Sequence, residues 1–179
     1  LPSGFPSPVL IGQHISDGFA SGMADWLRGL CKLPVKIATG GELLRPGVIY
    51  ISPSERNLTV DGNRRVALVE RAPTDRYRPS CDVLLSSVAE VFGRQAIGII
   101  LTGMGDDGAK GLARIRELGG LTLAQDEASS FIFGMNQVAI KAGAVHKVLS
   151  ITGIGDEMRR LAEPASLVFE AEFLSGSRS

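Results

Sequence analysis

The chain has 179 residues, 44% of them hydrophobic, which is enough for one sizeable core and predicts one main domain. Its 19 basic and 19 acidic residues balance, so net charge gives no reason to expect nucleic acid or an anionic membrane as a partner. The apolar runs are of strand length and no secretory signal is visible, so we expect a cytoplasmic protein that is not integral to the membrane. Cys31 and Cys81 have neither metal-site spacing nor disulfide density, and we expect them to be buried and reduced.

The first half of the chain predicts an alternation of strands and helices, interrupted by a hairpin. A buried strand over 8–13 is followed by an amphipathic helix over 19–30, whose apolar residues share one face. Asp-Gly at 61–62 between two β-rich runs is a hairpin signal, so we expect a small antiparallel excursion there. The strands expected in this half are 8–13, 34–38, 48–52, 58–60 and 66–69.

The second half returns to regular alternation. Pro79 is suited to the first turn of a helix that buries Val83, Leu84, Val88 and Val91, with Ser80 or Asp82 as its cap. Further strands are expected at 96–101, 121–125 and 144–151, and further helices at 109–118, 135–142 and 156–161. Together these elements predict an α/β fold: a doubly wound, mostly parallel sheet with helices on both faces and a small antiparallel hairpin. The expected domain covers 1–163, and 164–179 is a C-terminal tail without a clear pattern.

The segment 101–111, LTGMGDDGAKG, joins a buried strand to the start of a helix. Ligands gather at such places in open α/β sheets, because the crossover connections diverge and leave a crevice. Its glycines allow close backbone approach and bring Met104, Asp106 and Asp107 to the rim. Either Asp can be a helix N-cap, which is the commoner role, or a carboxylate that orients a histidine or binds a metal. Only a partner elsewhere in the chain decides between these two interpretations.

His14 is a candidate for that partner, because it also follows a buried strand directly. A histidine and an aspartate from two strand ends of one sheet can meet over the crevice, and acyl-transfer chemistry uses such a pair. A metal-dependent hydrolase using His14, Asp106 and Asp107 is a weaker hypothesis, because the other histidine, His146, falls inside an expected strand. We therefore expect no metal and no cofactor.

Four segments occur in one order along the chain: Gln13-His14, then RPSCDVL at 78–84, LTGMGDDGAKG at 101–111, and AQDEASS at 124–130 with Phe133-Gly134-Met135. They resemble the catalytic domain of the CheB-type protein-glutamate methylesterases of bacterial chemotaxis. That family removes methyl esters from glutamates of methyl-accepting chemotaxis receptors, and many members deamidate receptor glutamines, using a Ser-His-Asp triad. The resemblance implies that His14 is the general base, Asp107 its orienting acid, and Met104 the residue whose backbone N–H belongs to the oxyanion hole. It also implies a doubly wound parallel sheet with a hairpin.

One departure from the family outweighs the others. The family's nucleophile lies in a Gly-Ala-Ser-Thr-Gly-Gly segment after a preceding strand, and no such segment occurs in these 179 residues. A base and an acid without a nucleophile have nothing to activate, so we expect little or no esterase turnover from this polypeptide. The alternative is a non-catalytic binding or scaffold module that keeps the esterase cleft. Without that preceding strand an edge of the sheet would be exposed, so self-association is also expected.

Overall fold

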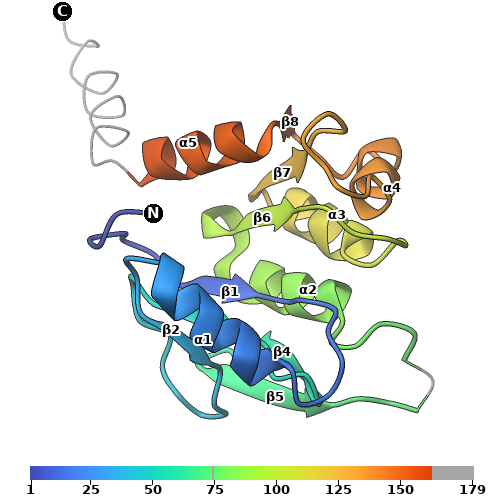
Figure 1. Cartoon of the computed structure of the whole chain (residues 1–179). Helices are drawn as coiled ribbons and strands as arrows, with labels where there is room; N and C mark the ends of the chain where they lie inside the picture. The colour runs from blue at the N-terminus through green and yellow to red at the C-terminus, as the bar shows by residue number, and fades with distance from the viewer. Residues whose placement is uncertain (74, 163–179) are drawn as a thin grey trace, which may run out of the picture.

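The computed structural model describes residues 1–73 and 75–162, so the expected tail at 164–179 lies outside the described residues (Figure 1). The predicted alternation of strands and helices is confirmed. The elements are β1 (Val9–Ile11), α1 (Ala20–Leu30), β2 (Val35–Ile37), β3 (Ile49–Ile51), β4 (Arg56–Val60), β5 (Val66–Glu70), α2 (Cys81–Phe92), the short 3₁₀ helix η1 (Gly93–Gln95), β6 (Ile97–Ile100), α3 (Ala109–Glu117), β7 (Leu121–Gln125), α4 (Met135–Lys141), β8 (Lys147–Leu149) and α5 (Ile151–Leu161).

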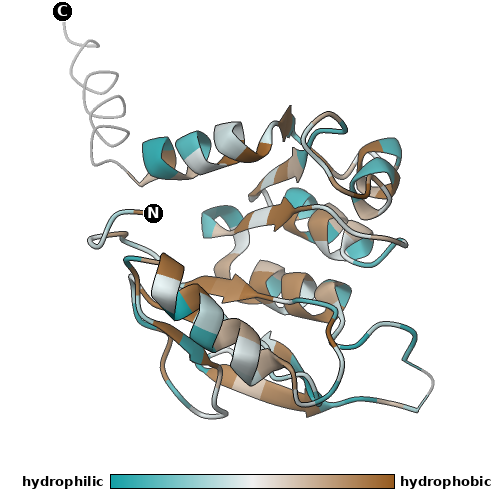
Figure 2. Ribbon diagram, in the orientation of Figure 1, coloured by the Kyte–Doolittle hydropathy of each residue, from teal (hydrophilic) through white to brown (hydrophobic). Residues whose placement is uncertain are grey.

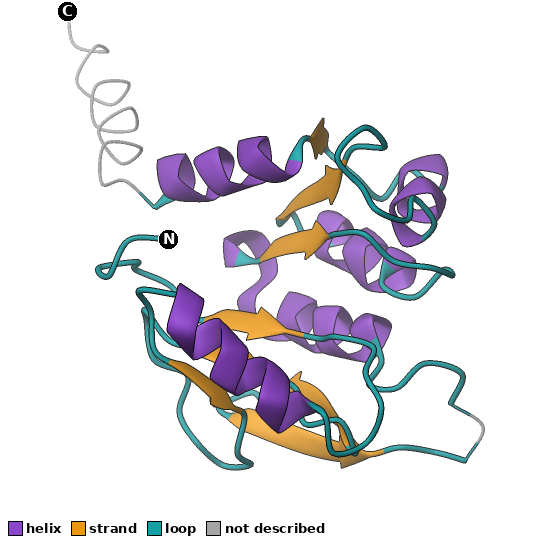
Figure 3. Ribbon diagram, in the orientation of Figure 1, coloured by secondary structure: helices purple, strands orange, loops and turns teal. Residues whose placement is uncertain are grey.

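The parallel strands form two groups of three, in the orders β1-β3-β2 and β6-β7-β8. Every pair within these groups is parallel, and the arrows of β1 and β6 point the same way in Figure 1. Helices lie on both sides of the strands (Figure 3). β4 and β5 form the predicted antiparallel hairpin, whose turn is closed by Asp61 accepting hydrogen bonds from the backbone N–H groups of Asn63 and Arg65. The predicted fold class is therefore confirmed.

Alternate side chains of β1 pack in different hydrophobic clusters, which explains why its sequence carries no polar alternation. The ribbon of β1 is coloured hydrophobic in Figure 2. Val9 and Ile11 of β1 pack in the cluster that includes Ala24 of α1. Leu10, between them, packs with Tyr50 and with α2 on the other face. Since both faces of the strands are covered, the loops at the strand ends are the accessible places. These loops carry the candidate residues.

Two predicted boundaries are wrong, namely the end of the last strand and the start of the last helix. The strand expected at 144–151 is only β8, and the last helix begins at Ile151 instead of at 156. The cause is Ser150, whose side chain accepts a hydrogen bond from the backbone N–H of Gly153 and caps α5. Similarly, Pro79 does not lie in the first turn of α2 but directly precedes Ser80, which caps that helix.

Among the described residues, four strands of the parallel groups have one unpaired edge each: β1 and β2 beside β3, and β6 and β8 beside β7. The apolar strand β1 is only half-buried, and Ile97 of β6 is 42% exposed. Within the described part of the chain, no helix has both the length and the apolar character that crossing a membrane requires.

Candidate active site

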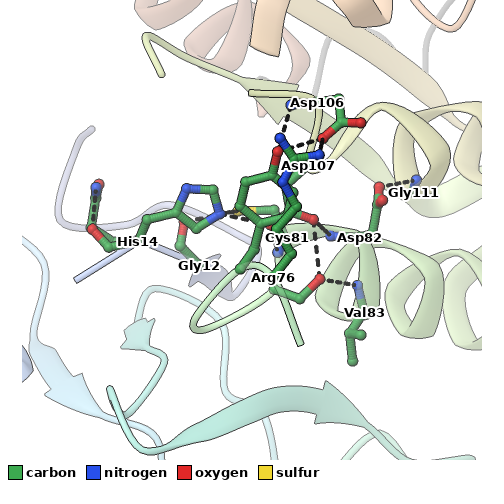
Figure 4. Close-up of polar contacts among 12 residues, drawn as sticks. Gly12, His14, Arg76, Cys81, Asp82, Val83, Asp106, Asp107 and Gly111 are labelled. Carbon is green, nitrogen blue, oxygen red and sulfur yellow. Dashed lines mark hydrogen bonds and ion pairs between the residues drawn. The ribbon is translucent and has the colours of Figure 1, made fainter. Parts of the chain in front are cut away.

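The loops that follow β1 and β6 bring His14 and Asp107 together, as the sequence predicted. His14 Nε2 lies 2.7 Å from Asp107 Oδ2, over a separation of 93 residues (Figure 4). The carboxylate is almost fully buried, with 1% of its side chain exposed, whereas 27% of the His14 side chain is exposed. The imidazole therefore has a buried partner on one nitrogen and reaches solvent with part of its ring.

Asp107 accepts three further hydrogen bonds, all from residues at the beginning of α2, of which Cys81 and Asp82 are labelled in Figure 4. The backbone N–H groups of Cys81 and Asp82 donate to it at 2.6 and 2.9 Å, and the Ser80 hydroxyl donates at 3.0 Å. Burial alone would raise the pKa of Asp107, but the bonds from His14 and these donors outweigh it and lower that pKa. Asp107 is thus a stable carboxylate at the positive end of a helix dipole.

The helix that Asp107 caps is not the one that follows it in the sequence. Gly108 occupies the N-cap position of α3 with φ +87° and, as a glycine, has no side chain with which to cap the helix. Instead Asp107 reaches α2, while Asp82 of α2 accepts a hydrogen bond of 2.8 Å from the backbone N–H of Gly111 in α3. The start of α2 is therefore bound by a carboxylate from the loop before α3, and the start of α3 by a carboxylate of α2. Gly111 makes this possible, because a Cβ there would lie 2.5 Å from Leu85 of α2.

Two residues that sequence reasoning did not assign to the site lie against His14. The Tyr77 ring stacks on the imidazole, with centroids 5.0 Å apart and planes 13° apart. Cys81 Sγ lies 3.8 Å from His14 Nε2 and 3.5 Å from the carbonyl oxygen of Gly12. No pattern in the sequence indicated either contact. Tyr77 precedes the RPSCDVL segment and Cys81 lies within it, and a single tyrosine or cysteine indicates no particular contact. Asn57 was missed in the same way: its side chain accepts the backbone N–H of Ser80 at 2.8 Å.

The Cys81 thiol beside the imidazole is not set up as a nucleophile. Burial, followed by the charge of Asp107, strongly raises its pKa, so the thiol keeps its proton. The raised pKa of Cys81 also disfavours a metal site built from His14, Cys81 and Asp107, whose possible ligand atoms lie within 4.8 Å of one another. A thiolate ligand would be needed there, and both oxygens of Asp107 already accept hydrogen bonds.

We expect Cys81 to react slowly with thiol reagents in the native protein, because only the thiolate attacks and burial disfavours it. In a Cys31→Ser variant, whose remaining thiol is Cys81, labelling should be about tenfold or more slower in native buffer than in denaturant. Stopped-flow or timed labelling with a chromogenic disulfide measures this. Equal rates in the two conditions would mean that the thiol is exposed and ionised.

Asp106 turns away from His14 although it is the neighbour of Asp107. Its carboxylate accepts a hydrogen bond from the Tyr77 hydroxyl and forms an ion pair of 3.6 Å with Arg76. The guanidinium of the nearby Arg78 instead donates to backbone carbonyl groups of its own loop, at Asp75 and Pro73. Asp106 does not join the group of possible ligand atoms around His14, which leaves the metal-hydrolase hypothesis without its third ligand.

Met104 lies at the rim with its side chain 76% exposed. The loop that carries Met104 is hydrogen-bonded to the end of β7 and to the loop after β7. The Gly103 N–H donates to the Ile132 carbonyl at 3.0 Å, and the Gln125 side chain accepts the Thr102 N–H at 2.9 Å. The backbone N–H of Met104 has no hydrogen-bond acceptor among the described residues. A free N–H on a braced loop is what an oxyanion hole requires.

Known proteins are similar to this chain over most of its length. The CheB methylesterase family matches residues 1–158. A protein-glutamate methylesterase/protein-glutamine glutaminase of Paramagnetospirillum magneticum is 56% identical over 80% of this chain and 41% of its own length. The protein-glutamate methylesterase FrzG of Myxococcus xanthus is 49% identical over 87% of this chain and 46% of its own length.

The crystal structure of the Thermotoga maritima CheB methylesterase catalytic domain superposes with a TM-score of 0.86 at 34% identity, over 90% of this chain and 87% of that one. The chain spans less than half the length of the two curated relatives above. A family match over 158 of 179 residues, close relatives and a shared fold agree with the four motifs. The chain therefore belongs to the CheB methylesterase family.

Proposed function

We propose that this chain is the part of a protein-glutamate methylesterase that supplies the general base, its orienting acid and an oxyanion donor. The observation that carries the proposal is the hydrogen bond between His14 Nε2 and the buried carboxylate of Asp107. This bond places the proton of the neutral imidazole on Nε2, so Nδ1 is left as the basic nitrogen. Methyl-accepting chemotaxis receptors are the proposed substrates, with their methylated glutamates and, in a deamidase reaction, their glutamines.

The chemistry follows the triad pattern. A nucleophilic hydroxyl gives its proton to Nδ1 of His14 while its oxygen attacks the ester carbonyl, and Asp107 stabilises the imidazolium that forms. The Met104 N–H is the proposed donor to the oxyanion. The imidazolium then protonates the leaving methoxide, which departs as methanol, and water attacks the acyl-enzyme in a second cycle that releases the glutamate and regenerates the base.

The nucleophile is the part that the described residues do not supply. No serine or threonine hydroxyl in 1–73 or 75–162 hydrogen-bonds to His14. Ser16 lines the shallow hollow beside His14 without bonding to it, and the Ser80 hydroxyl is engaged by Asp107 and by the backbone of Val83. This observation also favours the alternative function, a non-catalytic binding module that docks a receptor through the same cleft.

The two functions are separated by methanol release from a methylated receptor fragment. The purified polypeptide of 179 residues is expected to give little or no turnover, while a pull-down with the same fragment reports binding. Turnover that His14→Ala abolishes would overturn the expected inactivity and establish the esterase. Binding without turnover, even after a nucleophile is supplied, would support the binding module.

We further propose that the polypeptide associates with itself through the unpaired edges of β1 and β6. Exposed parallel edges offer unpaired N–H and C=O groups to another copy. Light scattering over a range of protein concentrations should show a mean mass that rises above 18.9 kDa. A constant monomer mass at high concentration would contradict this expectation.

A further inference from the structure

His14 is constrained on its face as well as on its edge. The Tyr77 ring lies against the imidazole, nearly parallel to it, at a centroid distance of 5.0 Å. The loop that carries Tyr77 is tied to the loop that carries His14, because the backbone N–H of Ile15 donates to the carbonyl oxygen of Arg78 at 3.3 Å. One hydrogen bond to Asp107 fixes one ring atom but leaves the ring free to rock about it. A flat contact on the ring face restricts this rocking of the imidazole.

Tyr77 is itself anchored from the other active-site loop. Its hydroxyl donates to the Asp106 carboxylate and accepts the Asp106 backbone N–H at 3.1 Å. Arg76 covers the Tyr77 ring, with its guanidinium 5.1 Å from the ring centroid. Arg76 also pairs with the Asp106 carboxylate (Figure 4). Gly105 leaves room for the hydroxyl, since a Cβ built at this glycine, whose φ is +100°, would collide with it.

The protonation states suit this arrangement. The hydrogen bond to Asp106 raises the pKa of Tyr77, so the phenol keeps the proton that it donates. The same bond lowers the pKa of Asp106, whose carboxylate stays ionised. The two neighbouring aspartates thus hold the imidazole by different routes: Asp107 bonds to its edge, and Asp106 holds the aromatic ring that covers its face.

We propose that Tyr77, anchored by Asp106, is a positioning residue that fixes the plane of the His14 imidazole, so that Nε2 stays on Asp107 and Nδ1 stays directed outward. The catalytic meaning of this arrangement rests on the proposed function, but the constraint on the ring does not. Tyr77 touches no substrate in this proposal and acts only through His14.

The constraint can be measured by NMR without any turnover. The chain has two histidines, so His14→Ala assigns both sets of ring signals. His146 serves as an internal reference, because its Nδ1 is bonded to Thr122 Oγ1 at 2.8 Å, away from Tyr77. Two signals are informative for His14: the ring-current shift of its carbon-bound protons, which reports stacking, and the solvent exchange of its Nε2 proton, which reports the bond to Asp107.

In Tyr77→Ala, the His14 ring protons should lose their upfield shift and the Nε2 proton should exchange on the order of tenfold faster. Tyr77→Phe keeps the ring but removes the anchor, so the upfield shift should remain while exchange increases by a smaller factor. Phe131→Ala is the matched control, since this aromatic side chain is 94% exposed and makes no ring contact with His14. The His146 signals should be unchanged in all three variants.

Unchanged His14 signals in Tyr77→Ala would overturn the proposal, as would an equal effect of Phe131→Ala. If Tyr77→Ala unfolds the protein, Tyr77→Phe decides, and an unaltered exchange rate in that variant would exclude the Asp106 anchor. Failure of the esterase proposal has a different signature, because it appears as absent turnover in a folded protein to which the nucleophile segment has been joined, with the His14 signals intact.

Discussion

Joining the family's nucleophile segment to Leu1 is expected to give the chain esterase activity about 10³-fold or more above that of the 179 residues alone. The segment is the Gly-Ala-Ser-Thr-Gly-Gly strand-turn of the methylesterases, taken from a curated relative. The expected gain is large because base, orienting acid and oxyanion donor act as a unit with the nucleophile and contribute little without it. Methanol release from a methylated receptor fragment measures it.

The controls for this fusion separate chemistry from folding. Serine to alanine in the added segment, and His14→Ala in the chain, should each return the fusion to the background rate. Thermal unfolding of all three proteins establishes that they fold alike. If the fusion folds, carries the serine and still shows no turnover, the esterase proposal is wrong. The binding module would then be the function of this family member.

Replacing Asp107 by alanine is expected to destabilise the chain by about 3 kcal/mol or more, in addition to releasing His14. The reason is that the buried carboxylate accepts four hydrogen bonds, from His14, Ser80, Cys81 and Asp82. Its removal leaves two backbone N–H groups at the start of α2 without an acceptor in a buried place. Denaturant titration of the free energy of unfolding measures the effect.

Asp106→Ala is the matched control, because it removes the same group from the neighbouring position. The Asp106 side chain is 55% exposed, and its ion pair and hydrogen bond are close to solvent. A loss of about 1 kcal/mol or less is expected for it. Equal losses in the two variants would contradict the view that Asp107 joins α2 to the site, since the loop as a whole would then be responsible.

The pH dependence of the Asp107 effect has a definite sign. The pKa of this carboxyl is lowered in the folded protein, so the charged form is favoured by folding. Its contribution is complete above the ordinary Asp value of about 4 and is lost as the pH falls through the lowered folded value. The stability difference between the wild type and Asp107→Ala should therefore be constant near neutral pH and shrink below about pH 4.

Local patterns in the sequence were sufficient for the element types, and they placed His14, Asp106 and Asp107 at strand ends; the family resemblance then singled out Asp107 as the partner of His14. Apolar runs without alternation marked strands covered on both faces, and the strand ends then placed both residues at one edge of the sheet. The short-range signals failed where a single cap decides a boundary, as at Ser150, which starts α5 five residues earlier than the pattern indicated.

The sequence by itself determined the fold class and the strand ends that carry His14 and Asp107, because periodicity is a property of local sequence, and its family motifs implied that these two residues meet. Only the tertiary structure decided what surrounds them: Tyr77 on the imidazole face, Cys81 beside its nitrogen, and Asp107 at the start of α2 instead of α3. These contacts join segments far apart in the chain. They depend on how closely α2 and α3 approach and on where two loops cross, and neither is encoded in the spacing of any one segment.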